Sequence, residues 1–415
     1  MPSDTGGTED ISIKLRSSNR QTRVNKVKEG LVNRVYPNKT GMNDMENLLQ
    51  ISNRKPTRQI NVGNVPIGGG NPIPIQTMTT TLTHDTDATL HQIERCVEAG
   101  AQIVRVAVPE EKDAKALSAI VRRASVPIVA DIHFNYRFAL AAVDAGVAKV
   151  RINPGNIGSE KRISQVLSTA KAADIPIRIG VNEGSLEKDL LEKYPSPTAE
   201  ALVESAMRHI KICEDHDFTD IAISVKSSHP LRMIEANRLL SAKVRYPLHL
   251  GVTEAGTPRR AHVKSTIGIG TLLMEGIGDT IRISITGDPV EEVLTAKELL
   301  RTLGLADNIL DVISCPFCGR GDPQADYEGI VIAAEELLEK HGIKIPVAVM
   351  GCEVNGPGET RNAEIGIHLG GKELAVLKVR GERVRTFRGR DEVNPQFLAN
   401  ALLEAAQQLQ DGNTA

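Results

Sequence analysis

The feature that most constrains the fold is a series of eight strand-like segments, most of them followed by a helix-like segment. The segments are NPIPIQTM, AQIVRVAVP, VPIVADIHF, AKVRINPGN, PIRIGVNEG, DIAISVKSS, PLHLGVTEAG and TIRISITGDP. Strands that alternate with helices pair in parallel through right-handed crossovers, and eight such units over roughly 240 residues have the size of a (β/α)8 barrel. The sequence therefore predicts an α/β fold with a (β/α)8 TIM barrel over residues 58–305, in preference to a doubly wound open sheet.

Five of these strands carry polar residues at every second position. Parallel strands that are covered on both faces normally read as continuous apolar runs, and a period of two places the polar side chains on one face. The apolar positions, such as Ile177, Ile179 and Val181, should pack against the helices. The polar positions should then point into the barrel near its C-terminal mouth, where TIM barrels have their active sites. These positions are Arg105, Arg151, Asn153, Arg178, Asn182, Ser224, Lys226, Arg282 and Ser284.

The pattern changes after about residue 305. A helix is expected near residues 324–341, followed by the strand KIPVAVMG, the loop CEVNGPGE, the segments AEIGIHL and ELAVLKV, and a final helix that ends ALLEAAQQLQ. This order predicts a small α+β domain over residues 306–415. Residues 1–57 lack sustained periodicity and carry scattered Lys and Arg among Ser, Asn and Gly, which indicates an extension that is disordered or precedes the natural start.

Composition excludes several classes of partner. The chain has 415 residues and a net charge of −2, without a long basic face, which argues against nucleic acid as the main partner. Its apolar runs are strand-sized, so we expect no membrane span. The polar, acidic N-terminus lacks the apolar core of a secretory signal, which favours the cytoplasm. A small molecule is the expected ligand.

The five cysteines fall into two groups. Cys96 and Cys213 lie in segments with helical periodicity, where a lone cysteine usually acts as a small core residue. Cys315, Cys318 and Cys352 lie in the C-terminal domain, the first two as a CxxC pair. Three thiolates suit either zinc or an iron-sulfur cluster.

Zinc and a cluster differ in what else they need. A zinc ribbon usually has a second CxxC pair or closely spaced histidines, whereas here only single histidines such as His341 and His368 are available. A redox CxxC needs no third cysteine. Three cysteines can hold a cubane with one iron that lacks a thiolate, and Glu359 in NGPGE offers that iron an exchangeable oxygen ligand, which would leave a catalytic position open. A non-redox barrel enzyme with a structural zinc, and a cluster-bearing sensor of iron or oxygen, remain as alternatives.

Several motifs occur together in an order that points to one family. VPIVADIHF, RINPGNIG, PIRIGVN, VKSS, HLGVTEAG, GIGDTIRIS, CPFCGR and GCEVNGPGE give the chain, over about residues 57–410, a close resemblance to the 4-hydroxy-3-methylbut-2-enyl diphosphate synthase family. The resemblance implies a barrel joined to a C-terminal 4Fe-4S domain similar to a sulfite-reductase module. It also implies reductive ring opening of 2-C-methyl-D-erythritol 2,4-cyclodiphosphate, in the methylerythritol phosphate route to isoprenoids.

The same resemblance implies roles for individual residues. The cluster ligands would be Cys315, Cys318, Cys352 and Glu359. The diphosphate contacts would be Arg105, Arg151, Arg178, Asn182, Lys226, Arg282 and Ser284, and guanidinium forks suit phosphate oxygens bidentately.

Glu254 resembles the family's acid near the reacting carbon, and Asn355 would lie beside the cluster. Asp131 and His133 are weaker candidates, because they could serve to orient their neighbours. The resemblance further implies a homodimer and flavodoxin or ferredoxin as the electron donor.

Overall fold

The computed structural model describes residues 54–153, 157, 159–194, 196–306, 310–410 and 412. All of these residues belong to one compact unit. The predicted N-terminal extension therefore lies, apart from residues 54–57, outside the described residues. Within the described ranges, no helix combines the length and the apolar character that crossing a membrane requires.

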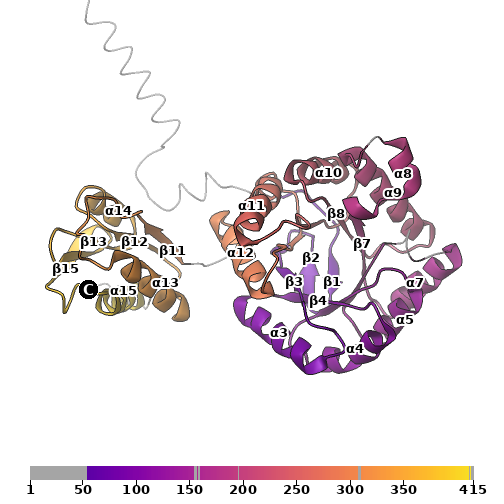
Figure 1. The fold of residues 1–415 in the computed structure, drawn as a ribbon, viewed down its shortest axis with the longest axis horizontal. Coiled ribbons are helices and arrows are strands. Elements are labelled where there is room, and N and C mark those ends of the chain that lie inside the picture. Colours follow the sequence, from indigo (N-terminus) through magenta and orange to yellow (C-terminus); the bar gives the residue numbers. More distant parts are fainter. Residues whose placement is uncertain are drawn as a thin grey trace, which may run out of the picture. The chain divides into compact units, whose positions relative to one another are not determined.

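Eight parallel strands form the predicted barrel (Figure 1). They are β3 (Gln76–Met78), β4 (Ile103–Ala107), β5 (Ile128–Asp131), β6 (Lys149–Ile152), β7 (Ile177–Asn182), β8 (Ile221–Lys226), β9 (His249–Leu250) and β10 (Thr280–Ile281). The first six form one sheet in chain order, and the last two form a parallel pair. Single bridges from Ile75 to Ile281 and from Ile223 to Leu248 join the pair to the two edges of the sheet and close the ring.

A ring of helices surrounds these strands (Figure 1). It comprises α3 (Thr86–Ala99), α4 (Glu111–Arg123), α5 (Tyr136–Asp144), α7 (Glu160–Ala172), α8 (Lys188–Lys193), α9 (Ala199–Asp215), α10 (Pro230–Lys243), α11 (Pro258–Met274) and α12 (Pro289–Thr302). Local signals explain several helix starts. The side chains of Asp85 and Thr198 accept hydrogen bonds from the first turns of α3 and α9. Proline opens α10, α11 and α12, where its missing N–H costs no hydrogen bond.

Alternate strand residues face opposite sides, as the period of two predicted. Ile177, Ile179 and Val181 belong to the core that also contains helix residues such as Leu167 and Ile210.

One end of the barrel interior is apolar. Ile103, Val129 and Ala222 point inward there and pack on an N-terminal hairpin formed by β1 (Ile60–Val62) and β2 (Val65–Ile67). Figure 1 shows this hairpin within the ring of strands. The hairpin closes one end of the barrel, and the polar inward residues occupy the other.

The C-terminal residues form a second core on a five-stranded sheet in chain order. The strands are β11 (Asp311–Ser314), β12 (Pro346–Met350), β13 (Ile365–Leu369), β14 (Leu374–Val379) and β15 (Glu382–Arg388), of which the first three pair in parallel and the last two join antiparallel. The helices are α13 (Tyr327–Lys340), α14 (Gly356–Asn362) and α15 (Pro395–Gln410).

Three features of this region differ from the sequence-based expectation. The sequence reading missed β11 and β15, because both strands are short or mainly exposed and carry little apolar alternation. The segment CEVNGPGE was expected to be a loop, but its second half begins α14. Pro357 lies in the first turn of that helix, where proline is tolerated, so the Gly-Pro-Gly sequence does not prevent helix formation.

Candidate substrate and metal sites

A basic pocket lies where the inward polar residues of the barrel converge. It is a cavity of about 140 Å³ lined by Arg105, Asp131, His133, Arg151, Arg178, Asn182, Ser224, Lys226, Thr253 and Arg282. All the predicted substrate contacts line this pocket except Ser284. The hydroxyl of Ser284 instead accepts a hydrogen bond from Arg282 Nη1. Residues that are more than 170 positions apart in the chain thus form one site, because they lie on neighbouring barrel strands or in the segments directly after them.

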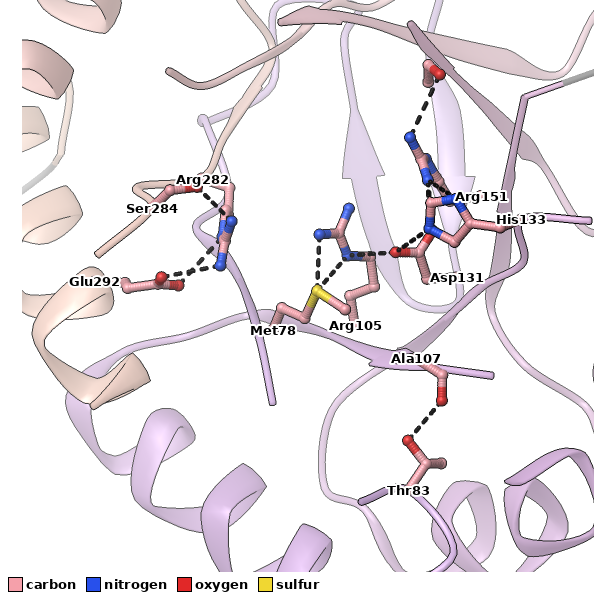
Figure 2. Close-up of polar contacts among 11 residues, drawn as sticks. Met78, Thr83, Arg105, Ala107, Asp131, His133, Arg151, Arg282, Ser284 and Glu292 are labelled. Carbon is pink, nitrogen blue, oxygen red and sulfur yellow. Dashed lines mark hydrogen bonds and ion pairs between the residues drawn. The ribbon is translucent and has the colours of Figure 1, made fainter. Parts of the chain in front are cut away.

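Two guanidinium groups of the pocket are held by one carboxylate, Asp131 (Figure 2). Asp131 Oδ1 lies 2.9 Å from Arg151 Nη1, and Asp131 Oδ2 lies 3.6 Å from Arg105 Nε. His133 Nε2 is 3.1 Å from Arg151 Nη1. Burial opposes ionisation of Asp131, but the positive charges of Arg105 and Arg151 and the contact with His133 hold the pKa of this carboxyl well below its ordinary value. These contacts support an orienting role for Asp131 and His133.

Arg282 is held by a carboxylate that the sequence reading did not single out. Glu292 lies in the first turn of α12 and is buried, and its Oε1 is 2.9 Å from Arg282 Nη2 (Figure 2). It also accepts hydrogen bonds from Thr77 Oγ1 at 2.9 Å and from the backbone N–H of Ile285 at 3.0 Å. An acidic residue in a first helical turn is common, so the sequence offered no signal that this one enters the barrel wall.

Three basic side chains are fully buried in the barrel interior. The three guanidinium nitrogens of Arg178, the ammonium of Lys149 and both ring nitrogens of His249 are buried and find no hydrogen-bond partner among the described residues. Burial and the neighbouring positive charges hold the pKa values of Arg178, Lys149, Lys226 and His249 well below their ordinary values. Buried positive charge without a partner is unfavourable unless an anion binds there, so the pocket is suited to an anionic ligand.

Arg151 reaches its place because the neighbouring strand has a glycine there. Gly180 lies on the inward face of β7, and a Cβ atom at this position would lie 2.3 Å from Arg151 Nε. We expect Gly180→Ala to displace the Arg151 guanidinium and to weaken binding of a diphosphate ligand by about tenfold, the equivalent of one charge-assisted hydrogen bond of about 1.5 kcal/mol.

The measurement is isothermal titration calorimetry with the cyclic diphosphate. Gly184→Ala is the matched control, because a Cβ at Gly184 would meet nothing within 4 Å. Equal affinities for Gly180→Ala and the control would show that Arg151 does not contribute to binding.

The three C-terminal cysteines surround a second cavity, of about 190 Å³. Its lining comprises Cys315, Pro316, Phe317, Cys318, Arg320, Met350, Gly351, Cys352 and Asn355. The cysteines meet because β11 and β12 pair in parallel, with Ser314 beside Val349, so that the segments after both strands leave the sheet at the same edge. The structure thus brings together three predicted metal ligands and Asn355.

The CxxC turn is held by aromatic residues. The hydroxyl of Tyr327 donates to Val349 O at 2.6 Å and accepts from the backbone N–H of Cys315 at 3.0 Å. Phe317 has a φ of +47° and its ring stacks on Tyr327, with the centroids 4.7 Å apart. A Cβ at Gly351 would lie 2.4 Å from the Phe317 ring, so this glycine makes room for the turn.

The two thiols of this turn have lowered pKa values. Burial raises the pKa of Cys315, but hydrogen bonding by Tyr327 and the backbone N–H of Gly351 outweighs it, and the net pKa is lowered. The backbone N–H and the guanidinium of Arg320 lower the pKa of Cys318. The thiolate is the form that binds metals. By contrast, burial raises the pKa of Cys96 to about 11 and that of Cys213 to about 12, and both lie in the barrel core as predicted.

Comparison with known proteins identifies the family. Residues 57–297 match the GcpE TIM-barrel domain, and residues 311–402 match the GcpE protein C-terminal domain. The chain belongs to the GcpE family.

Curated relatives of this GcpE-family chain share one name. This chain is 53% identical over 341 residues to the 4-hydroxy-3-methylbut-2-en-1-yl diphosphate synthase (flavodoxin) of Clostridium perfringens. The aligned region covers 82% of this chain and 97% of the relative. The chain is 50% identical over 348 residues to the protein of the same name from Nitratidesulfovibrio vulgaris, which covers 83% of this chain and 89% of the relative. Among solved structures, dihydropteroate synthase from Yersinia pestis is similar at a TM-score of 0.44 and 14% identity, over 59% of this chain and 97% of that one.

Two predicted catalytic residues of the GcpE-family chain do not line either cavity. Glu254 is exposed in the segment after β9, where its neighbour Thr253 lines the basic pocket. Its φ of +51° is uncommon for a residue other than glycine, and such conformations gather at functional positions. Glu359 is exposed on α14, one helical turn beyond Asn355. Their roles stay predictions.

Lys149 and His249 are two further basic residues of the barrel interior that the sequence reading missed. Lys149 has the same strand parity as Arg151, and His249 has the same parity as Gly251 and Thr253, so the period of two that identified the other cations also applies to them. Both lie deeper than the residues that line the pocket, and a lysine or histidine at the start of a strand gives no separate signal.

Proposed function

We propose that this GcpE-family protein uses a 4Fe-4S cluster to open the ring of 2-C-methyl-D-erythritol 2,4-cyclodiphosphate with two electrons. The product is 4-hydroxy-3-methylbut-2-enyl diphosphate, in the methylerythritol phosphate pathway. The observation that carries the proposal is the joint presence of a basic pocket, whose Arg178 has no hydrogen-bond partner among the described residues, and a cavity lined by three thiols. A non-redox barrel enzyme with a structural zinc is not favoured, because the curated relatives are named as flavodoxin-dependent synthases.

The barrel binds the diphosphate. Arg151 and Arg105 present oriented guanidinium forks, and Lys226 adds a point charge from β8. Asn182 donates through its amide, and Arg178, Arg282 and Ser284 complete the set. Buried in the barrel, these charges act in a low-dielectric setting, where they attract phosphate more strongly than they would in water.

The residues of the thiol cavity fit an iron-sulfur cluster. Three thiols spread around a cavity of about 190 Å³ suit such a group. Cys315, Cys318 and Cys352 would hold it, with Glu359 as the fourth, exchangeable ligand. When bound, the cluster supplies one-electron transfer to the substrate.

Residues of the chain donate the proton and orient the substrate. Glu254 donates the proton with which the hydroxyl group leaves when the ring C–O bond has broken. Asn355 orients the substrate at the thiol cavity, and Asp131 keeps the guanidinium groups of Arg105 and Arg151 in position. The protein acts in the cytoplasm. It acts as a homodimer, because the proposed substrate residues line a pocket of the barrel and the proposed cysteine ligands line a different cavity in the C-terminal domain, so that a second copy can supply the other half of the site.

The test is purification without oxygen. We expect brown protein with about four irons per chain and no stoichiometric zinc, together with conversion of the cyclodiphosphate when reduced flavodoxin is added. Colourless protein that retains one zinc per chain would overturn the proposal.

Activity is expected to depend on a low-potential one-electron donor. The residues that line the thiol cavity are cysteines, one arginine and mostly apolar neighbours, which provide no place for a nicotinamide. Steady-state assays should therefore show turnover with chemically reduced flavodoxin or ferredoxin and none above background with NADPH and the enzyme alone. Efficient turnover with NADPH as the sole reductant would contradict this expectation.

A further inference from the structure

The thiol cavity contains a cation to which the proposed function gives no role. Arg320 is the one basic side chain among the described residues that line this cavity. Its Nε donates to Cys318 Sγ at 3.1 Å. Both residues are exposed, so this contact lies at the open side of the cavity.

The backbone brings Arg320 to the sulfur. The N–H of Gly321 donates to Cys318 O at 3.0 Å and closes a turn over residues 318–321. A Cβ at Gly321 would lie 2.2 Å from the ring of Phe317, so the turn depends on glycine at this position. Arg320 is therefore held two residues beyond Cys318 by a compact turn and folds back on it.

The surroundings of Arg320 differ from those of other arginines in the domain. Arg380 and Arg390 form ion pairs with Glu364 and Glu373. The guanidinium of Arg320 instead faces sulfur. Arg320 therefore contacts one of the proposed cluster ligands directly.

We propose that Arg320 tunes the electron affinity of the cluster by donating a hydrogen bond to the sulfur of Cys318. Reduction adds negative charge to a cluster, and hydrogen bonds to its sulfurs and nearby positive charge favour the reduced form. Arg320 therefore raises the reduction potential and eases electron transfer from a low-potential donor. This inference rests on the proposed function, because it requires the cluster at Cys315, Cys318 and Cys352.

The experiment is a redox titration of the full-length, anaerobically purified protein, followed by electron paramagnetic resonance, with iron content measured on each sample. The variants are Arg320→Gln, which removes the charge and the fork, and Arg320→Lys, which keeps the charge. Lys344→Gln is the control. It removes one exposed positive charge that precedes the start of β12, whereas Cys352 follows the end of the same strand.

We expect the ratio of reduced to oxidised clusters at a given potential to be about tenfold lower in Arg320→Gln than in the wild type, which corresponds to a midpoint more negative by about 59 mV for a one-electron couple. Arg320→Lys should lie between the two, and Lys344→Gln should match the wild type.

Each outcome separates the two proposals. Wild-type protein without a cluster would overturn the proposed function itself. A fully loaded Arg320→Gln protein with the wild-type midpoint would overturn the inference and leave the proposed function intact. If Arg320→Gln loses iron, the midpoint of Arg320→Lys tests the inference instead. A wild-type midpoint in Arg320→Lys would show that the guanidinium donor does not affect the potential, and would overturn the inference.

Discussion

The Glu359→Cys variant is expected to keep its iron and to lose its turnover. Thiolate is a softer ligand for iron than carboxylate, so the variant should bind the cluster at least as well as the wild type. Substrate would not displace a thiolate from the iron, so turnover should fall by about 10²-fold. Altering the surroundings of a metal ligand can reduce activity by that much.

The structure allows this substitution without damage to the fold. Glu359 is exposed, and other residues anchor its helix. Lys378 Nζ donates to Pro357 O at 3.0 Å, and Thr360 Oγ1 donates to Gly356 O at 2.6 Å. Neither contact involves the side chain of Glu359.

The measurement pairs anaerobic iron content with steady-state reduction of the cyclodiphosphate. Glu336→Cys is the matched control, because it places a new thiol at an exposed position of α13 in the same domain. Near-normal turnover by a fully loaded Glu359→Cys protein would remove Glu359 from the mechanism. A structural zinc would predict little change in activity for either variant.

The Arg178→Met variant is expected to bind the cyclodiphosphate about 10- to 100-fold more weakly, because it loses charge-assisted hydrogen bonds worth about 1.5 to 3 kcal/mol. Arg178 is 1% exposed, and its guanidinium has no partner among the described residues. An unbranched apolar side chain removes a buried charge at little loss of packing. The melting temperature of the ligand-free variant should therefore equal or exceed that of the wild type.

Calorimetric affinity, the melting temperature and the visible spectrum of the cluster test this expectation together. The spectrum should not change, because Arg178 belongs to the barrel core region and not to the thiol cavity. Arg122→Met, at an exposed position of α4, controls for the loss of one positive charge. An unchanged affinity, or a bleached spectrum, would contradict the assignment of Arg178 to phosphate binding.

Two repeating patterns made much of this protein predictable. The alternation of strands and helices indicated the eight barrel strands, and each of the eight predicted segments contains one of the parallel strands. The period of two within strands identified Arg105, Arg151 and Arg178 as inward residues, and all three line the basic pocket. Strand geometry requires alternate side chains to face opposite sides, so a local pattern is enough to assign them to a face. The CxxC pair could likewise be recognised in the sequence, because a spacing of two residues brings both thiols onto one turn.

Other features depend on contacts between distant residues, which leave no periodic trace in the chain. Glu292 belongs to an ordinary amphipathic helix, and only the packing of α12 on the barrel brings its carboxylate to Arg282. In the sequence, Gly180 appears only as a residue that would interrupt a strand. In the structure, it provides the space for the guanidinium of Arg151. The hairpin that closes the barrel and the helix that carries Glu359 form from segments of weak propensity, because the surrounding core stabilises them. Local chemistry selects which face a side chain occupies, whereas close packing between segments decides which other side chain it meets.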